Sequence, residues 1–202
     1  MENGPTIKEA TIKFIPEFSS RLSALLSGDV DLIKSVPVDS MERVESDSES
    51  KKISGLTGRP TLIQFNTFKK GPLQDVRVRQ AINYALDVDF LLENVMNGKG
   101  QRLKGLLTPI NLSYTEVEGY EYNPEKALDL IAEAGYKAED IKLTMNTTNG
   151  YYPMDSQVSQ AIAGELEKIG INVKVEQVEA GIYMERMTSK KMDDLFFFTS
   201  AA

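Results

Sequence analysis

The sequence contains no cysteine and no histidine among its 202 residues. Cysteine nucleophiles, Ser-His-Asp triads, zinc fingers and metal sites with histidine ligands are therefore excluded from this chain. The lack of cysteine does not indicate a compartment, because both cytoplasmic and secreted proteins can do without it. No apolar run is long enough to span a membrane, and the acidic start lacks the apolar stretch of a secretory signal.

The charge is acidic overall but unevenly spread along the chain. The net charge of -7 argues against nucleic acid or an anionic membrane as the main partner. Residues 51–104 hold ten Lys/Arg against four Asp/Glu, a net charge of +6. Because no aromatic residues are interleaved with these basic residues, we interpret the block as a solvated face, with a polyanion-binding patch as the alternative.

Motifs that would indicate catalysis are missing. The Gly-x-Gly at residues 98–100 follows no predicted strand and lacks the further glycine of a dinucleotide-binding loop, and no Gly-Lys-Ser/Thr loop is present. Acidic pairs occur at Asp29/Asp31, Asp87/Asp89 and Asp193/Asp194. We interpret them as helix caps or solvated turns, since no pair sits in a dense loop of oxygen ligands. The sequence therefore predicts no enzyme, no metal and no cofactor.

The first 60 residues give short and weak signals. Alternation of apolar and polar residues predicts strands at residues 10–14 and 31–33. Between them, Ser19 or Ser20 can cap a helix that ends at Gly28. A further short helix is expected near residues 41–44, followed by a flexible tip at residues 45–50.

From residue 61 onward, predicted strands and helices alternate. Strands are expected at residues 61–67, 141–145, 171–175 and 195–198. Helices are expected after the caps Asp75, Asp87, Asn123 and Asp155, with a short one near residues 182–188, and residues 101–122 read as an irregular loop. This order predicts an α/β fold with helices packed on a mixed sheet. The strand at 195–198 is apolar on both faces and should be central in that sheet.

Several blocks together resemble a known family. Residues 71–87, GPLQDVRVRQAINYALD, resemble a hallmark stretch of the peptide/nickel-type solute-binding proteins, called family 5. Further similar blocks follow the family's order at residues 26–31, 122–127, 132–136 and 166–173. The resemblance covers essentially the whole chain.

The resemblance implies a two-lobed receptor that closes on its solute by a hinge. Residues 1–60 would form the end of lobe I and a crossover segment, and residues 61–202 most of lobe II. We expect the chain to be an internal fragment that lacks the earlier part of lobe I, the export or lipoprotein signal and the C-terminal return to lobe I. The implied function is the substrate-binding component of an ABC importer, which captures oligopeptides outside the membrane and delivers them to permease subunits.

Candidate ligand-binding residues follow from the position of loops at strand ends, where such receptors bind solutes. They are Thr147, Thr148, Asn149, Gly150, Tyr151 and Tyr152 in one turn, and Thr199 and Ser200 after the last strand. The alternative is an ordinary strand-to-helix turn. In peptide-binding relatives an acidic residue shortly after the last strand holds the peptide's amino group, and an aromatic residue often precedes it. Residues 199–202 contain neither.

Peptide specificity is therefore left open by the sequence. The alternatives are a binding protein for a nickel chelate, a sugar or another small solute, and a non-catalytic interaction module. The resemblance implies an extracytoplasmic location, in the periplasm or as a cell-surface lipoprotein. No nucleic-acid partner is expected, and membrane contact would come only through a lipid anchor or the permease.

Overall fold

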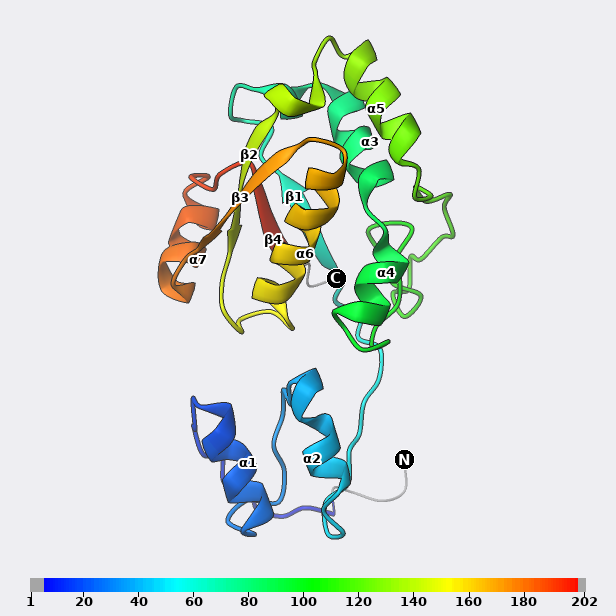
Figure 1. The fold of residues 1–202 in the computed structure, drawn as a ribbon. Coiled ribbons are helices and arrows are strands. Elements are labelled where there is room, and N and C mark those ends of the chain that lie inside the picture. Colours follow the sequence, from blue (N-terminus) through cyan, green and yellow to red (C-terminus); the bar gives the residue numbers. More distant parts are fainter. Residues whose placement is uncertain (1–5, 200–202) are drawn as a thin grey trace. The chain divides into compact units, whose positions relative to one another are not determined.

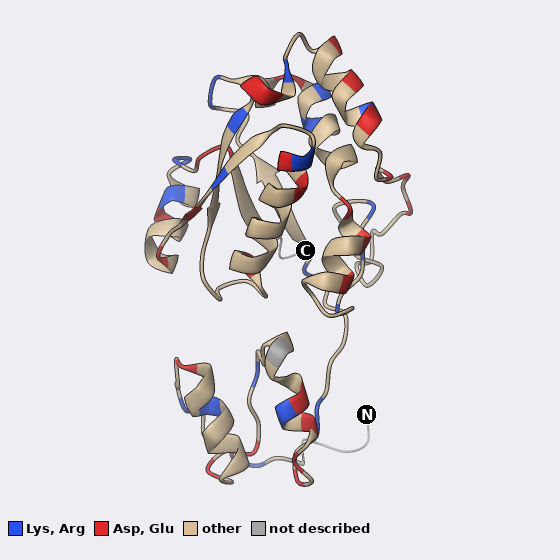
Figure 2. Ribbon diagram, in the orientation of Figure 1, with Lys and Arg blue, Asp and Glu red and all other residues tan. Residues whose placement is uncertain are grey.

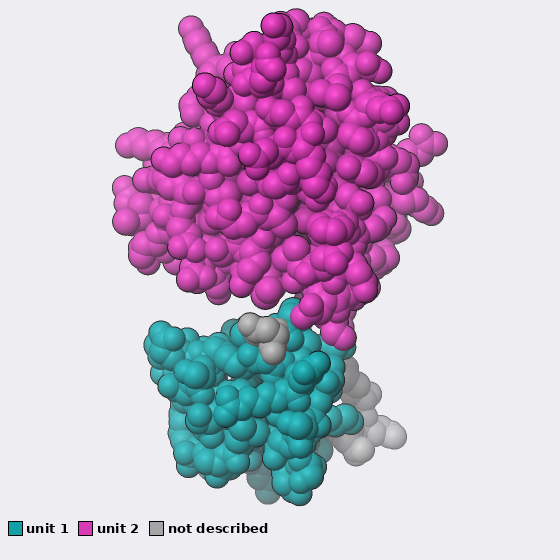
Figure 3. Space-filling model, in the orientation of Figure 1, with its two compact units in different colours: residues 1–54 teal, residues 55–202 magenta. Residues whose placement is uncertain are grey.

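The computed structural model describes residues 6–199, without the side chain of Asp39. The chain divides into two compact units, residues 1–54 and residues 55–202, which Figure 3 colours separately.

The first unit consists of short helices joined by extended segments. Its elements are α1 (Phe18–Leu26), the 3-10 helix η1 (Val38–Ser40) and α2 (Met41–Glu45), which Figure 1 labels or shows in blue. Helix α1 buries Leu22 and is followed by Gly28 with a φ of 79°, which confirms the predicted helix and its glycine stop. The strands predicted at residues 10–14 and 31–33 are wrong, because no strand pairs with either segment in the described part of this unit.

The second unit is built on one mixed sheet of four strands. They are β1 (Thr61–Phe65), β2 (Lys142–Thr147), β3 (Asn172–Gln177) and β4 (Leu195–Thr199), in the spatial order β1-β4-β2-β3. Strand β2 runs parallel to β3 and β4, whereas β1 runs antiparallel to β4. The predicted mixed α/β fold and the internal position of the last strand are both confirmed.

Helices pack around this sheet (Figure 1). They are α3 (Val76–Ala85), α4 (Val88–Asn94), α5 (Pro124–Glu133), α6 (Asp155–Lys168) and α7 (Ala180–Thr188), with the short 3-10 helices η2 (Pro72–Gln74) and η3 (Ala138–Asp140). Helix α6 packs on β2 and β3, and α3 packs on α5. The predicted apolar stripe of α3 is buried at each of its positions, Val78, Ala81, Ile82 and Ala85.

Side-chain caps fix where three of these helices begin. The carboxylates of Asp75 and Asp87 accept the backbone N–H groups of Arg77 and Phe90 at 2.8 and 2.9 Å. Asn123 caps α5 in the same way, with Pro124 at the first helical position. Hydrogen bonds from the Arg77 side chain and backbone lower the pKa of Asp75 to about 2. These caps confirm the predicted ones.

A buried polar link joins β2 to the residues that precede β4. The side chain of Asn146, with no exposed surface, donates to the Asp193 carboxylate at 3.0 Å and accepts the Asp193 N–H at 2.7 Å. Asp194 accepts the Thr144 N–H at 2.8 Å and pairs with Lys69 at 3.0 Å. The hydrogen bond to Asp194 raises the pKa of Lys69. The acidic pair Asp193/Asp194 therefore stabilises the sheet and is neither a helix cap nor a solvated turn.

Candidate functional site

The two predicted ligand-binding segments lie at the same edge of the sheet. The turn that contains Asn149 and Tyr151 follows the carboxyl end of β2, and Thr199 is the last residue of β4. Because β2 and β4 are parallel, their carboxyl ends meet at one edge, where open α/β sheets present their loops to ligands. Thr199 is half-buried, and Ser200 lies outside the described residues.

The turn is organised by the carboxylate of Asp155, which is only 1% exposed. It accepts hydrogen bonds from the hydroxyl of Thr148 and from the backbone N–H groups of Gly150, Tyr152 and Ser156. The prediction that Asp155 caps α6 is wrong in position, because Asp155 is the first residue of the helix and Met154 occupies the cap position. Most of its hydrogen bonds lead back into the turn.

Burial separates the candidate residues into two groups. Thr147, Thr148 and Tyr152 are at most 8% exposed and form the base of the turn. Asn149, Gly150 and Tyr151 are exposed. The surface that the turn offers to a solute therefore consists of one amide side chain, one glycine and one phenol ring.

Glycine is required at position 150 for a conformational reason. Gly150 has a φ of 86°, in the left-handed region that residues with a Cβ rarely adopt, although a Cβ there would meet no atom within 4 Å. The residue is therefore needed for the shape of the turn and not for close packing.

An aromatic cluster supports the turn from below. The ring of Tyr152 lies 5.9 Å from that of Phe197 on β4 and 6.3 Å from that of Tyr183 on α7. Tyr151 packs edge-to-face on Tyr152 at 4.9 Å. The Tyr183 hydroxyl donates to the carbonyl of Phe197 at 2.8 Å, and burial raises the pKa values of both Tyr152 and Tyr183. These two phenols stay neutral and hold the turn against the sheet.

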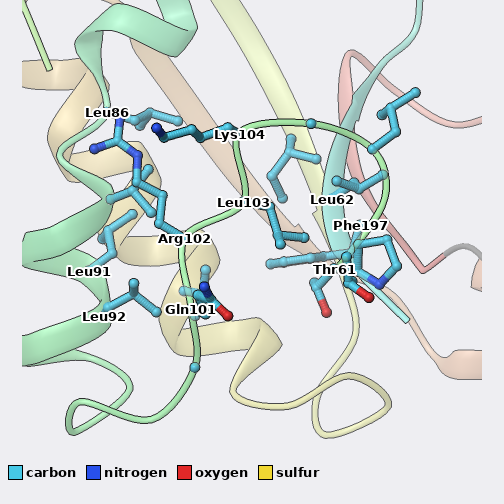
Figure 4. Close-up of a pocket in the computed structure, with 18 of the residues that line it drawn as sticks. Thr61, Leu62, Leu86, Leu91, Leu92, Gln101, Arg102, Leu103, Lys104 and Phe197 are labelled. Atoms are coloured by element: carbon cyan, nitrogen blue, oxygen red, sulfur yellow. The ribbon is translucent and has the colours of Figure 1, made fainter. Parts of the chain in front are cut away.

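A cavity of about 1050 Å³ lies beside this edge of the sheet (Figure 4). Its wall combines apolar residues from β1, α4, β4 and the loop at residues 99–110, among them Leu62, Leu91, Leu92, Leu103 and Phe197. Pro153 of the turn also lines it. The sequence analysis missed this cavity, because the loop showed no regular period and its leucines gave the only signal.

Basic side chains also line the cavity, namely those of Arg59, Arg79, Lys99, Arg102 and Lys104, and no acidic residue does. Several of these charges are used within the chain. Arg79 donates to the carbonyls of Leu73 and Gln74, and Arg102 pairs with Asp89 at 3.3 Å. Figure 2 shows basic and acidic positions interspersed over the unit. This distribution agrees with a solvated face better than with a polyanion patch.

No metal or membrane feature accompanies the site. Within residues 6–199 there is no group of three or more acidic side chains placed to hold a metal ion. The described helices are also too short and too polar for any of them to cross a membrane.

Comparison with known proteins identifies the family. Residues 2–199 match the bacterial extracellular solute-binding proteins, family 5 Middle. Heme-binding protein A of Haemophilus influenzae is 32% identical over 181 residues, which cover 87% of this chain and 32% of that protein. The dipeptide-binding protein of Escherichia coli K12 is 31% identical over 189 residues, which cover 90% of this chain and 34% of that protein.

A solved structure agrees with the sequence matches. The oligopeptide-binding protein AppA of Bacillus subtilis, in complex with a nonapeptide, superposes with a TM-score of 0.81 at 25% identity. The match covers 93% of this chain and 40% of AppA, and the chain spans about a third of the length of its curated relatives. The resemblance seen in the sequence is confirmed: the chain belongs to the bacterial extracellular solute-binding proteins of family 5.

Proposed function

We propose that this chain belongs to the substrate-binding component of an ABC importer that captures oligopeptides outside the cytoplasmic membrane and delivers them to a permease. The observation that carries the proposal is the turn after β2, which exposes Asn149 and Tyr151 at the carboxyl edge of a family 5 sheet. Residues 1–60 would belong to the end of lobe I and residues 61–202 to lobe II.

Family membership supports a role in binding and not in catalysis. Family 5 solute-binding proteins are non-catalytic components of transport systems, and members work in the periplasm or elsewhere outside the cytoplasm. We place this protein in the same location. A lipid anchor stays a prediction from the family resemblance.

Oligopeptides fit the chemistry of the exposed turn. The side-chain amide of Asn149 can both donate to and accept from the main chain of an extended peptide. The ring of Tyr151, 53% exposed, offers an apolar face to a peptide side chain. Relatives named for dipeptide and oligopeptide binding support this choice of solute.

A second candidate solute is an apolar anion. The cavity beside the turn is lined by leucines and basic side chains without acidic ones, and one relative is named a heme-binding protein. An anionic apolar molecule would match this lining by burying its apolar part and pairing its charge. Because the chain has no histidine, no histidine of this segment would ligate a metal.

The test is native mass spectrometry of the full-length protein, purified without denaturation. Bound masses that fragment as short peptides would support the peptide receptor. A single non-peptide mass, with a porphyrin spectrum or another anionic chromophore, would support the second candidate instead. A bare protein that also ignores an added peptide pool would contradict both.

A further inference from the structure

The Asp155 carboxylate differs from an ordinary helix cap in what it binds. Its Oδ1 accepts the N–H groups of Gly150 and Ser156 at 2.8 and 2.9 Å, and its Oδ2 accepts the Tyr152 N–H at 3.1 Å and the Thr148 hydroxyl. Of these four donors, only Ser156 belongs to the helix that follows. Asp87, by comparison, accepts the Phe90 N–H inside its own helix.

These hydrogen bonds determine which donors remain for a solute. The amides of Gly150 and Tyr152 already donate to a buried carboxylate and are not free to bind a ligand. The Thr148 hydroxyl is used in the same way. What the turn still presents is the side chain of Asn149 and the ring of Tyr151, which lie between the anchored positions.

We propose that Asp155 is a positioning residue of the solute site, which fixes the orientation of Asn149 and Tyr151 through its hydrogen bonds to the turn. The proposal rests on the proposed function, because it assumes that this turn contacts the solute. Hydrogen bonds to a buried carboxylate are short and strong, so they hold the turn in one shape before the solute arrives. A preformed turn lowers the ordering cost of binding.

The substitution Asp155→Asn tests the proposal with almost no change in size. An asparagine has one acceptor oxygen, and its NH2 group would face N–H donors that have no way to pair with it. At Oδ1 the new group would meet two backbone amides, and at Oδ2 it would meet the Tyr152 N–H. The turn should therefore lose its fixed shape in either orientation of the amide.

The experiment uses the full-length protein and a random tripeptide pool, with affinity measured by titration calorimetry and thermal stability by differential scanning calorimetry. Asp155→Asn should weaken the apparent affinity by at least about tenfold, the equivalent of one strong hydrogen-bond contact. Asp87→Asn is the matched control, because it removes a helix-capping carboxylate away from the turn. It should lower the thermal midpoint and leave the affinity unchanged.

Hydrogen exchange separates positioning from a general loss of stability. In Asp155→Asn the amides of Gly150 and Tyr152 should exchange faster, while that of Ile162 in α6 keeps its protection. If Asp155→Asn does not fold, Thr148→Val replaces it, because it removes one donor to Oδ2 within a side chain of the same shape. It should weaken the affinity by about threefold.

The outcomes distinguish the two proposals. A wild-type protein that does not bind the peptide pool contradicts the proposed function. A wild-type protein that binds, together with a folded Asp155→Asn variant of equal affinity, contradicts the positioning role alone. Equal affinity losses in Asp155→Asn and Asp87→Asn would also contradict it, because they would reduce the effect to stability.

Discussion

The two compact units use their apolar residues in different ways. In residues 55–199 the apolar side chains of strands and helices meet in one core, which includes Met145, Leu166 and Leu195 with at most 0% exposure. In the described part of residues 1–54, only Leu22 and Val44 are buried hydrophobic residues. Large apolar side chains that stay exposed in that unit are Ile7, Ile12, Phe14, Leu32 and Ile53.

The difference shows what alternation of apolar and polar residues can and cannot specify. The segments at residues 10–14 and 31–33 alternate like half-buried strands, yet neither has a partner strand within its unit. The alternating residues of β2 and β3 do form strands, because each pairs with a neighbour and packs under α6. A strand is therefore a property of the paired sheet, and alternation only indicates which segments can join one.

The largest expected difference between the units concerns core substitutions in the 202-residue chain. Met145→Ala should lower the free energy of unfolding by about 2–5 kcal/mol, because Met145 is fully buried in β2. Phe14→Ala should change it by less than about 0.5 kcal/mol, because the Phe14 side chain is 93% exposed. Urea unfolding followed by circular dichroism measures both, and a large cost at Phe14 would reveal a core in the first unit.

A smaller effect is expected from the polar link within the second unit. Asn146→Ala should cost about 1–3 kcal/mol, because it leaves Asp193 without its partner in a buried position. Asn172→Ala, at an exposed position at the start of β3, is the matched control and should be near neutral. If both substitutions cost the same, the link between β2 and Asp193 does not stabilise the sheet.

The smallest effect is a pH dependence that distinguishes a capped helix of the second unit from the uncapped helices of the first. The pKa of Asp75 is lowered from 3.8 to about 2, so its stabilising contribution is present above pH 3.8 and is lost as the pH falls through 2. The thermal midpoint of Asp75→Asn should therefore lie below that of the wild type at pH 5 and approach it near pH 2. A gap that stays constant over this range would contradict the cap. Helices α1 and α2 have no side-chain cap that would give such a dependence.

Most of the second unit could be predicted because its signals are local. The spacing of Val78, Ala81, Ile82 and Ala85 predicts α3, and the caps at Asp75 and Asp87 predict where helices begin. The doubly apolar run at residues 195–198 predicts an internal strand, since such a run needs cover on both faces.

The organisation of the site could be predicted only in part. The turn after β2 was found from its polar composition, but the burial of Thr147, Thr148 and Tyr152 depends on the aromatic contacts to α7 and β4. The role of Asp155 was mistaken, because an acidic residue at a helix start gives the same sequence signal whether it faces the helix or the preceding turn. The cavity was missed because its wall joins segments that are far apart in the sequence.

The central claim is that the exposed part of the turn binds the solute, and one measurement tests it most directly. Calorimetric titration of the full-length protein with a tripeptide pool would compare the wild type with the double variant Asn149→Ala, Tyr151→Ala. We predict an affinity at least about tenfold weaker in the double variant, with an unchanged thermal midpoint, because both side chains are exposed and should contribute little to folding. Equal affinity of the two proteins would contradict the account and place the solute away from this turn.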